Sequence, residues 1–130
     1  MNIHRFRNGY GIARGQVRAN EDVMMIPLEI ITTVSNQIAQ EFHPEQIILF
    51  GSYAHGEPHR DSDVDLLVVM SHGMDNVYQA IEILNRVAPP FPIDLLVRTP
   101  GEVKQRIALQ DTFMQNIMDK GKVLYAATQR

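Results

Sequence analysis

The stretch IILFGSYAHGEPHRDSDVDLLVVM, from Ile47 to Met70, decides the fold class. It contains two apolar runs of strand length, separated by a Gly-Ser pair and a polar loop. The second run begins with Asp63-Val64-Asp65, although charges rarely lie in a buried strand unless another group compensates them. Because side chains alternate along a strand, the two carboxylates are expected on one face, about 6–7 Å apart along the strand.

Helices and strands are expected to alternate along the rest of the chain. Apolar residues recur at helical spacing in two segments, which predict helices at 27–42 and 74–88. A capping box at Thr99–Glu102 predicts helical segments over 100–120. The expected strands are the shorter apolar runs at 47–50, 63–70, 93–97 and 123–125, and a short helical turn is expected over 52–55. This alternation predicts an α/β (or α+β) domain in which helices flank a small mixed β-sheet.

The 130 residues amount to one domain, but charge is spread unequally over them. Residues 1–25 show no clear periodicity, so we expect a basic N-terminal extension there and the compact domain at 26–130. The first 20 residues contain four arginines and no acidic residue, whereas residues 21–130 carry 8 basic and 15 acidic residues. An acidic domain argues against nucleic acid as a direct partner, because binding to its backbone requires a basic face.

Composition excludes several other classes of protein. Hydrophobic residues make up 45% and charged residues 21% of the chain, which is typical of a globular rather than a disordered protein. No apolar run reaches the roughly 18 residues that a membrane helix requires, and the N-terminus lacks the apolar segment of a secretory signal. Without cysteine, disulfides and thiolate metal sites are impossible. A cytoplasmic protein with no membrane partner is therefore expected.

A third carboxylate, Asp94, belongs to the apolar strand expected at 93–97. If that strand lies beside the strand at 63–70, three carboxylates converge, and their repulsion raises at least one pKa unless cations hold them. Mg²⁺ is the expected cation, because it takes oxygen ligands and keeps positions open for phosphate oxygens. Gly51 allows close backbone approach to a phosphate, and Ser52 adds a hydroxyl donor. Carboxylate-held metals beside a phosphate-binding turn indicate two-metal phosphoryl or nucleotidyl transfer.

The same residues resemble a known family. Leu49-Phe50-Gly51-Ser52, ten further residues, Asp63-Val64-Asp65-Leu66 and the later acid Asp94 are similar to the motif of the nucleotidyltransferase superfamily that includes DNA polymerase β. The string GSYAHGEPHRDSDVDLLVV and the segment Gly121–Tyr125 resemble its minimal nucleotidyltransferase (MNT) branch, over about residues 26–126. The resemblance implies a polymerase β-like nucleotidyltransferase fold.

The resemblance also implies a role for each motif residue. Asp63 and Asp65 would hold two Mg²⁺ ions. Asp94 would hold the catalytic ion and help to deprotonate the acceptor hydroxyl. Gly51 and Ser52 would bind the phosphates of the donor, for which ATP is expected.

One position departs from the family pattern. Members of the family commonly carry arginine where this chain has His55. A histidine is neutral much of the time near pH 7 and cannot make the bidentate phosphate contact of an arginine. Arg60, in the same loop, is the other candidate for a donor-binding side chain.

Two other metal sites are disfavoured by the sequence. An EF-hand loop beginning at Asp61 requires glycine where the chain has Leu66. His55 and His59 are spaced for zinc, but no cysteine or third ligand accompanies them. Neither pattern competes with the carboxylate motif.

Together the residues predict an Mg²⁺-dependent nucleotidyltransferase that moves a nucleoside monophosphate, AMP from ATP, to a hydroxyl. Related enzymes use extra domains to hold the acceptor, so a partner protein is expected to complete the site or to be the substrate. MNT proteins are often antitoxins of helical HEPN-domain toxins, and some adenylylate the toxin on tyrosine, so the resemblance implies a HEPN partner. Two alternatives stay open. One is a noncatalytic antitoxin or binding module that neutralises its partner by complex formation, and the other is an aminoglycoside-type nucleotidyltransferase that needs a helical partner chain.

A partner-binding surface is expected beside the carboxylates. Leu67 and Val69 continue the face on which the carboxylates lie, and helices in so small a domain can hardly cover both faces of a sheet. Tyr53, Met114 and Met118 are candidates for further exposed apolar surface. A large apolar patch of this kind usually marks an interface.

Overall fold

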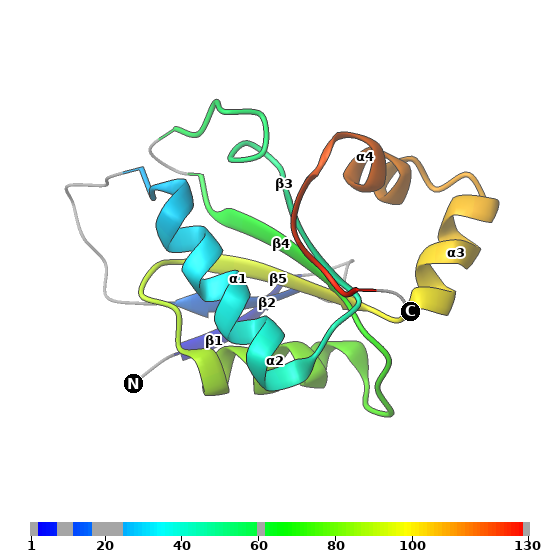
Figure 1. The fold of residues 1–130 in the computed structure, drawn as a ribbon, viewed down its shortest axis with the longest axis horizontal. Coiled ribbons are helices and arrows are strands. Elements are labelled where there is room, and N and C mark those ends of the chain that lie inside the picture. The colour runs from blue at the N-terminus through cyan, green and yellow to red at the C-terminus, as the bar shows by residue number, and fades with distance from the viewer. Residues whose placement is uncertain (1–2, 8–11, 17–24, 60–61, 129–130) are drawn as a thin grey trace.

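The structure is a computed structural model that describes residues 3–7, 12–16, 25–59 and 62–128 (Figure 1). Its strands form one sheet in the order β1-β2-β5-β4-β3-β6. The strands are β1 (Ile3–Arg7), β2 (Ile12–Gln16), β3 (Gln46–Phe50), β4 (Val64–Val69), β5 (Ile93–Arg98) and β6 (Lys122–Ala126). The helices are α1 (Leu28–Phe42), α2 (Asn76–Val87), α3 (Pro100–Ala108) and α4 (Thr112–Lys120). Within the described residues, no helix is long and apolar enough to cross a membrane.

The sheet is mixed, and this confirms the expected fold class. β4 and β5 run parallel and are joined through α2, because parallel neighbours require a crossover connection. All other neighbouring strands are antiparallel. The helical segments expected over 100–120 are α3 and α4, and the break between them coincides with a left-handed residue, Gln110 (φ 62°).

An N-terminal hairpin extends the sheet beyond β5. β1 pairs with β2, and β2 pairs with β5, where Arg14 lies opposite Asp94 in the register. Both strands lie within the segment for which the sequence predicted an extension. Neither five-residue strand alternates apolar and polar residues, so periodicity could not reveal them. That residues 26–130 fold without this hairpin stays a prediction.

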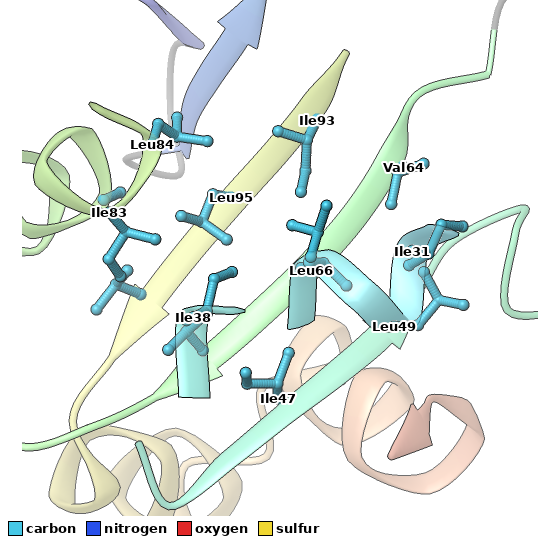
Figure 2. Close-up of a cluster of buried hydrophobic side chains, with 14 of the residues drawn as sticks. Ile31, Ile38, Ile47, Leu49, Val64, Leu66, Ile83, Leu84, Ile93 and Leu95 are labelled. Carbon is cyan, nitrogen blue, oxygen red and sulfur yellow. The ribbon is translucent and has the colours of Figure 1, made fainter. Parts of the chain in front are cut away.

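Helices α1 and α2 cover one face of the sheet, where the larger core lies (Figure 2). The isoleucines and leucines of this core are at most 1% exposed, and each contributes about 1.5–3 kcal/mol through burial. They include Ile31 and Ile38 of α1, Ile83 and Leu84 of α2, and Ile47, Leu66 and Leu95 of the sheet. Burial of Val64, Leu66 and Val68 in this core leaves Asp65 on the opposite face, because strand side chains alternate.

Helices α3 and α4 pack against that opposite face, which corrects the expectation of an exposed patch. Leu67 (0% exposed), Val69 (4%) and Met114 (2%) are buried in a second cluster there. Met118 is partly buried against the same cluster, and Tyr53 is partly buried against the first one. The expectation was wrong because the two short helices are enough to cover this face of β3, β4 and β5.

A capping box fixes the beginning of α3. The Thr99 hydroxyl accepts the Glu102 N–H (3.2 Å), and the Glu102 carboxylate accepts the Thr99 N–H (2.7 Å) and the Asn76 side-chain amide (3.1 Å). Burial raises the pKa of Glu102, but these hydrogen bonds and the charge of Arg98 lower it by more, so the pKa lies below its usual value. The box therefore ties the beginning of α3 to that of α2.

Gly121 ends α4 and brings the helix close to β3. Its N–H donates to the Ile117 carbonyl (2.8 Å). A Cβ at this position would overlap the Ile117 carbonyl and the Ile48 side chain, and it would press on the Leu49 carbonyl. Only glycine therefore allows the last turn of α4 to lie against the end of β3.

We expect Gly121→Ala to destabilise the fold by about 1–3 kcal/mol, which is typical of overpacking against backbone. Gly101→Ala is the matched control, because a Cβ there meets no atom within 4 Å and alanine is the better helix residue. Urea unfolding of both variants measures the difference. Equal stability of the two variants would contradict the close approach of α4 to β3.

Candidate functional site

Two of the expected carboxylates lie side by side in the sheet. Asp65 of β4 is in register with Asp94 of β5, and neighbouring strands are about 4.8 Å apart. Both side chains lie on the face of α3 and α4, because the residues that flank each of them belong to the core on the other face. The expectation that the two strands are neighbours is therefore met.

The three carboxylates differ in burial. Asp65 is half-buried, and Asp94 is 1% exposed. Asp63 is half-buried but precedes β4, which begins at Val64 rather than at residue 63. In this arrangement Asp65 is open to a ligand, whereas Asp94 is covered.

The turn after β3 places its backbone directly over Asp65. Gly51 has a left-handed backbone (φ 76°), and a Cβ on it would overlap the Asp65 carboxylate. Residues 52–56 form hydrogen-bonded turns rather than the expected helical turn, with the Ala54 N–H donating to the Gly51 carbonyl (3.0 Å). Ser52, in this turn, is half-buried. Glycine is therefore required both by conformation and by the approach of Asp65.

A pocket of about 310 Å³ opens beside Gly51 and Asp65. This volume lies at the lower end of the range for small-molecule sites. One wall is the turn after β3, including Ala54 and His55, and the other is α4 with Gly121. The pocket therefore lies between the turn that follows β3 and the end of α4.

Four pocket residues on α4 were missed by the sequence analysis. They recur at i, i+3, i+4 and i+7, so they share one face of the helix: Phe113, Asn116, Ile117 and Lys120. Phe113 also packs edge to face on Phe50, with ring centroids 5.9 Å apart. The helical spacing of these residues just before Gly121 was visible in the sequence. It could not show that this helix face lies toward the carboxylates.

The polar loop between the turn and β4 is described in part. His55 is exposed and lines the pocket, while His59 is exposed in the loop. The His59 N–H donates to the Ser62 hydroxyl (2.9 Å). Arg60, the other candidate for donor binding, and Asp61 lie outside the described residues.

The described residues contain no group of three or more His, Cys, Asp or Glu side chains that could hold a metal ion. This is compatible with magnesium, which is usually bound by one or two carboxylates together with substrate phosphates and water. Asp65 meets that requirement, because it faces the pocket beneath the Gly51 backbone. The carboxylate oxygens therefore fit Mg²⁺, whose remaining ligands would come from a bound nucleotide and water.

Comparison with known proteins gives concordant matches. Residues 32–130 match the family described as Polymerase beta, Nucleotidyltransferase. A relative from Methanocaldococcus jannaschii, named protein adenylyltransferase MJ0604, is 30% identical over 81 residues, which are 62% of this chain and 78% of that protein.

Solved structures share the fold. A nucleotidyltransferase structure from Sulfolobus solfataricus has a TM-score of 0.54 and 23% identity, over 76% of this chain and 79% of the other. A mutant of the toxin–antitoxin MntA-HpeT has a TM-score of 0.52 and 23% identity, over 75% of each chain. These two structures therefore show that the chain shares their fold.

Proposed function

Because the chain belongs to the polymerase beta nucleotidyltransferase family, we propose that it transfers AMP from ATP to a hydroxyl group of a partner protein. The chain is a nucleotidyltransferase by family, and the resemblance of its Gly-Ser and Asp-x-Asp motifs to that superfamily is confirmed. The donor, the acceptor and the residue roles are the proposal.

The observation that carries the proposal is the placement of Gly51 over Asp65, with Asp94 beside Asp65 in the sheet. A backbone that passes so close to a carboxylate can bind a phosphate oxygen while the carboxylate holds a metal on the same phosphate. Ser52, in the same turn, would add a hydroxyl donor. Such positioning, rather than covalent chemistry, is what phosphoryl and nucleotidyl transfer require of a protein.

Asp63 and Asp65 are the proposed Mg²⁺ ligands, with Asp94 as the third. Bound Mg²⁺ would neutralise phosphate charge and polarise the α-phosphate. Asp94 would accept the proton of the attacking hydroxyl, and this requires that its carboxylate become accessible from its buried position. Asp65 would keep the donor in place under the Gly51 backbone.

A protein acceptor is favoured by the relative that is named a protein adenylyltransferase. One structure with the same fold is described as a toxin–antitoxin. A helical HEPN-domain toxin as the partner rests on the sequence resemblance of Gly51–Asp65 and Gly121–Tyr125 to the MNT branch. Residues 26–130 are proposed as the transferase domain, and residues 1–25 as an addition to it.

The burial of Asp94 favours one alternative. A carboxylate that is 1% exposed cannot contact a donor or acceptor unless the site opens. If the site stayed closed, the chain would neutralise a partner by binding alone. The family membership and the open position of Asp65 favour catalysis.

The proposed function is tested by co-expression with the product of the neighbouring gene, which the proposal expects to be a HEPN-domain protein. The intact mass of the partner is expected to increase by one or more AMP units with the wild type and to stay unchanged with Asp65→Asn. A partner that binds tightly but stays unmodified with ATP and Mg²⁺ present would favour the noncatalytic alternative. Modification of an aminoglycoside in place of the protein would favour the third possibility.

A further inference from the structure

We infer that Lys120 is a donor-binding residue that contacts the triphosphate, and this inference rests on the proposed function. Of the described residues that line the pocket beside Gly51 and Asp65, Lys120 is the only one with a permanent positive charge. His55, on the opposite wall, is the other basic side chain among the described lining residues. A nucleoside triphosphate carries up to four negative charges, so a lysine beside the bound metal would strengthen its binding, and Lys120 lines the pocket where this contact would form.

The fold explains why Lys120 reaches this place. It is the last residue of α4, and the next residue, Gly121, lets the helix approach the Leu49 carbonyl and Ile48 of β3. β3 ends at Phe50, immediately before Gly51. The close approach of α4 to β3 therefore brings the lysine to the turn that is proposed to bind phosphate.

A simpler role for Lys120 is to stabilise the end of its own helix. A lysine in the last turn interacts favourably with the helix dipole, which contributes at most about 1 kcal/mol at an exposed site. That role affects stability only. It predicts no change in nucleotide affinity when the lysine is replaced, so the two roles are separable by measuring both properties.

The geometry also fits a contact with phosphate rather than with the base. Lys120 shares its pocket with Asp65 and Gly51, which are the proposed metal and phosphate groups. Phe113 and Asn116 lie earlier on the same helix face and offer an aromatic ring and an amide, which suit a nucleobase. Lysine acts on phosphate as a compact point charge on a flexible stem.

The test measures the affinity of AMP-PNP in the presence of Mg²⁺, by calorimetry, for the wild type and for Lys120→Met. Loss of a charge-assisted contact is expected to weaken binding about ten- to a hundredfold. Lys120→Arg should keep the affinity within about threefold of the wild type, because it keeps the charge. Adenosine, which has no phosphate, should bind equally to the wild type and to Lys120→Met.

Lys122→Met is the matched control, because Lys122 is also exposed and lies only two residues away, on β6. It should bind AMP-PNP like the wild type, and the melting temperatures of both methionine variants should stay close to that of the wild type. His55→Arg added to Lys120→Met should restore part of the affinity, since position 55 lines the same pocket.

Four results would overturn the inference. Unchanged AMP-PNP affinity in Lys120→Met, with loss in Arg60→Met, would assign the phosphate to Arg60. Equal losses of AMP-PNP affinity in Lys120→Met and Lys122→Met would indicate a general electrostatic effect of surface charge and not a specific contact. If the wild type itself binds no AMP-PNP, both the inference and the proposed donor fail, whereas normal transfer by Lys120→Met at low ATP contradicts the inference alone.

Discussion

Replacing Asp65 by asparagine is expected to reduce nucleotidyl transfer by about a thousandfold or more while the protein remains folded. Asp65 is the carboxylate that faces the pocket beneath Gly51, so its charge is the one available to a metal-bound donor. A thousandfold loss corresponds to about 4 kcal/mol of transition-state stabilisation, which is within what metal-ion catalysis supplies. The measurement is kcat at saturating ATP and Mg²⁺. Asp63→Asn should act in the same direction.

The fold of Asp65→Asn should be kept. Asparagine is nearly isosteric with aspartate, so the half-buried side chain should keep its place beneath Gly51. Asp119→Asn, on an exposed carboxylate of α4, is the control that should keep both activity and stability. Full activity of Asp65→Asn at limiting Mg²⁺ would exclude Asp65 as a metal ligand.

The second large effect is expected from Gly51→Ala. The left-handed backbone of Gly51 costs an alanine about 1–2 kcal/mol, and the overlap of its Cβ with the Asp65 carboxylate adds about 1–3 kcal/mol. Displacement of Asp65 should also lower transfer about a hundredfold, because misplacement by about 1 Å has effects of that size. Thermal unfolding and the transfer assay measure the two consequences.

Gly56→Ala separates backbone strain from the overlap. Gly56 has nearly the same backbone conformation (φ 74°), but a Cβ there meets no atom within 4 Å. This control should lose only the cost of the left-handed conformation and should keep its activity. If the two variants lose equal stability and equal activity, Gly51 is not pressed against Asp65, and the description of the site is wrong.

The fold was predictable from sequence where patterns were long or chemically distinct. The helical periodicity of α1 and the apolar runs of β3 and β5 were visible in the sequence, and each of these elements formed as expected. The spacing from Gly51 to Asp65 identified the family. β1 and β2 were not predictable, because they are defined by their pairing with each other and by the pairing of β2 with β5, rather than by a local pattern.

The site was only partly predictable. Asp65 and Gly51 are brought together as expected, since their contact follows from the antiparallel pairing of β3 with β4. The burial of Leu67 and Val69 depends on α3 and α4, whose packing direction no periodicity encodes. For the same reason Lys120 could not be recognised as a pocket residue until the contact of Gly121 with β3 was known.

The most direct test of the account uses ATP labelled on either the α- or the γ-phosphate. Purified protein and its partner are incubated with Mg²⁺ and each label in turn, and the label that becomes covalently attached to the partner is measured. A nucleotidyltransferase site at Gly51, Asp63, Asp65 and Asp94 predicts attachment of the α-label only, with release of the γ-label as pyrophosphate and no attachment by Asp65→Asn. Attachment of the γ-label, or equal attachment of the α-label by Asp65→Asn and the wild type, would contradict the account.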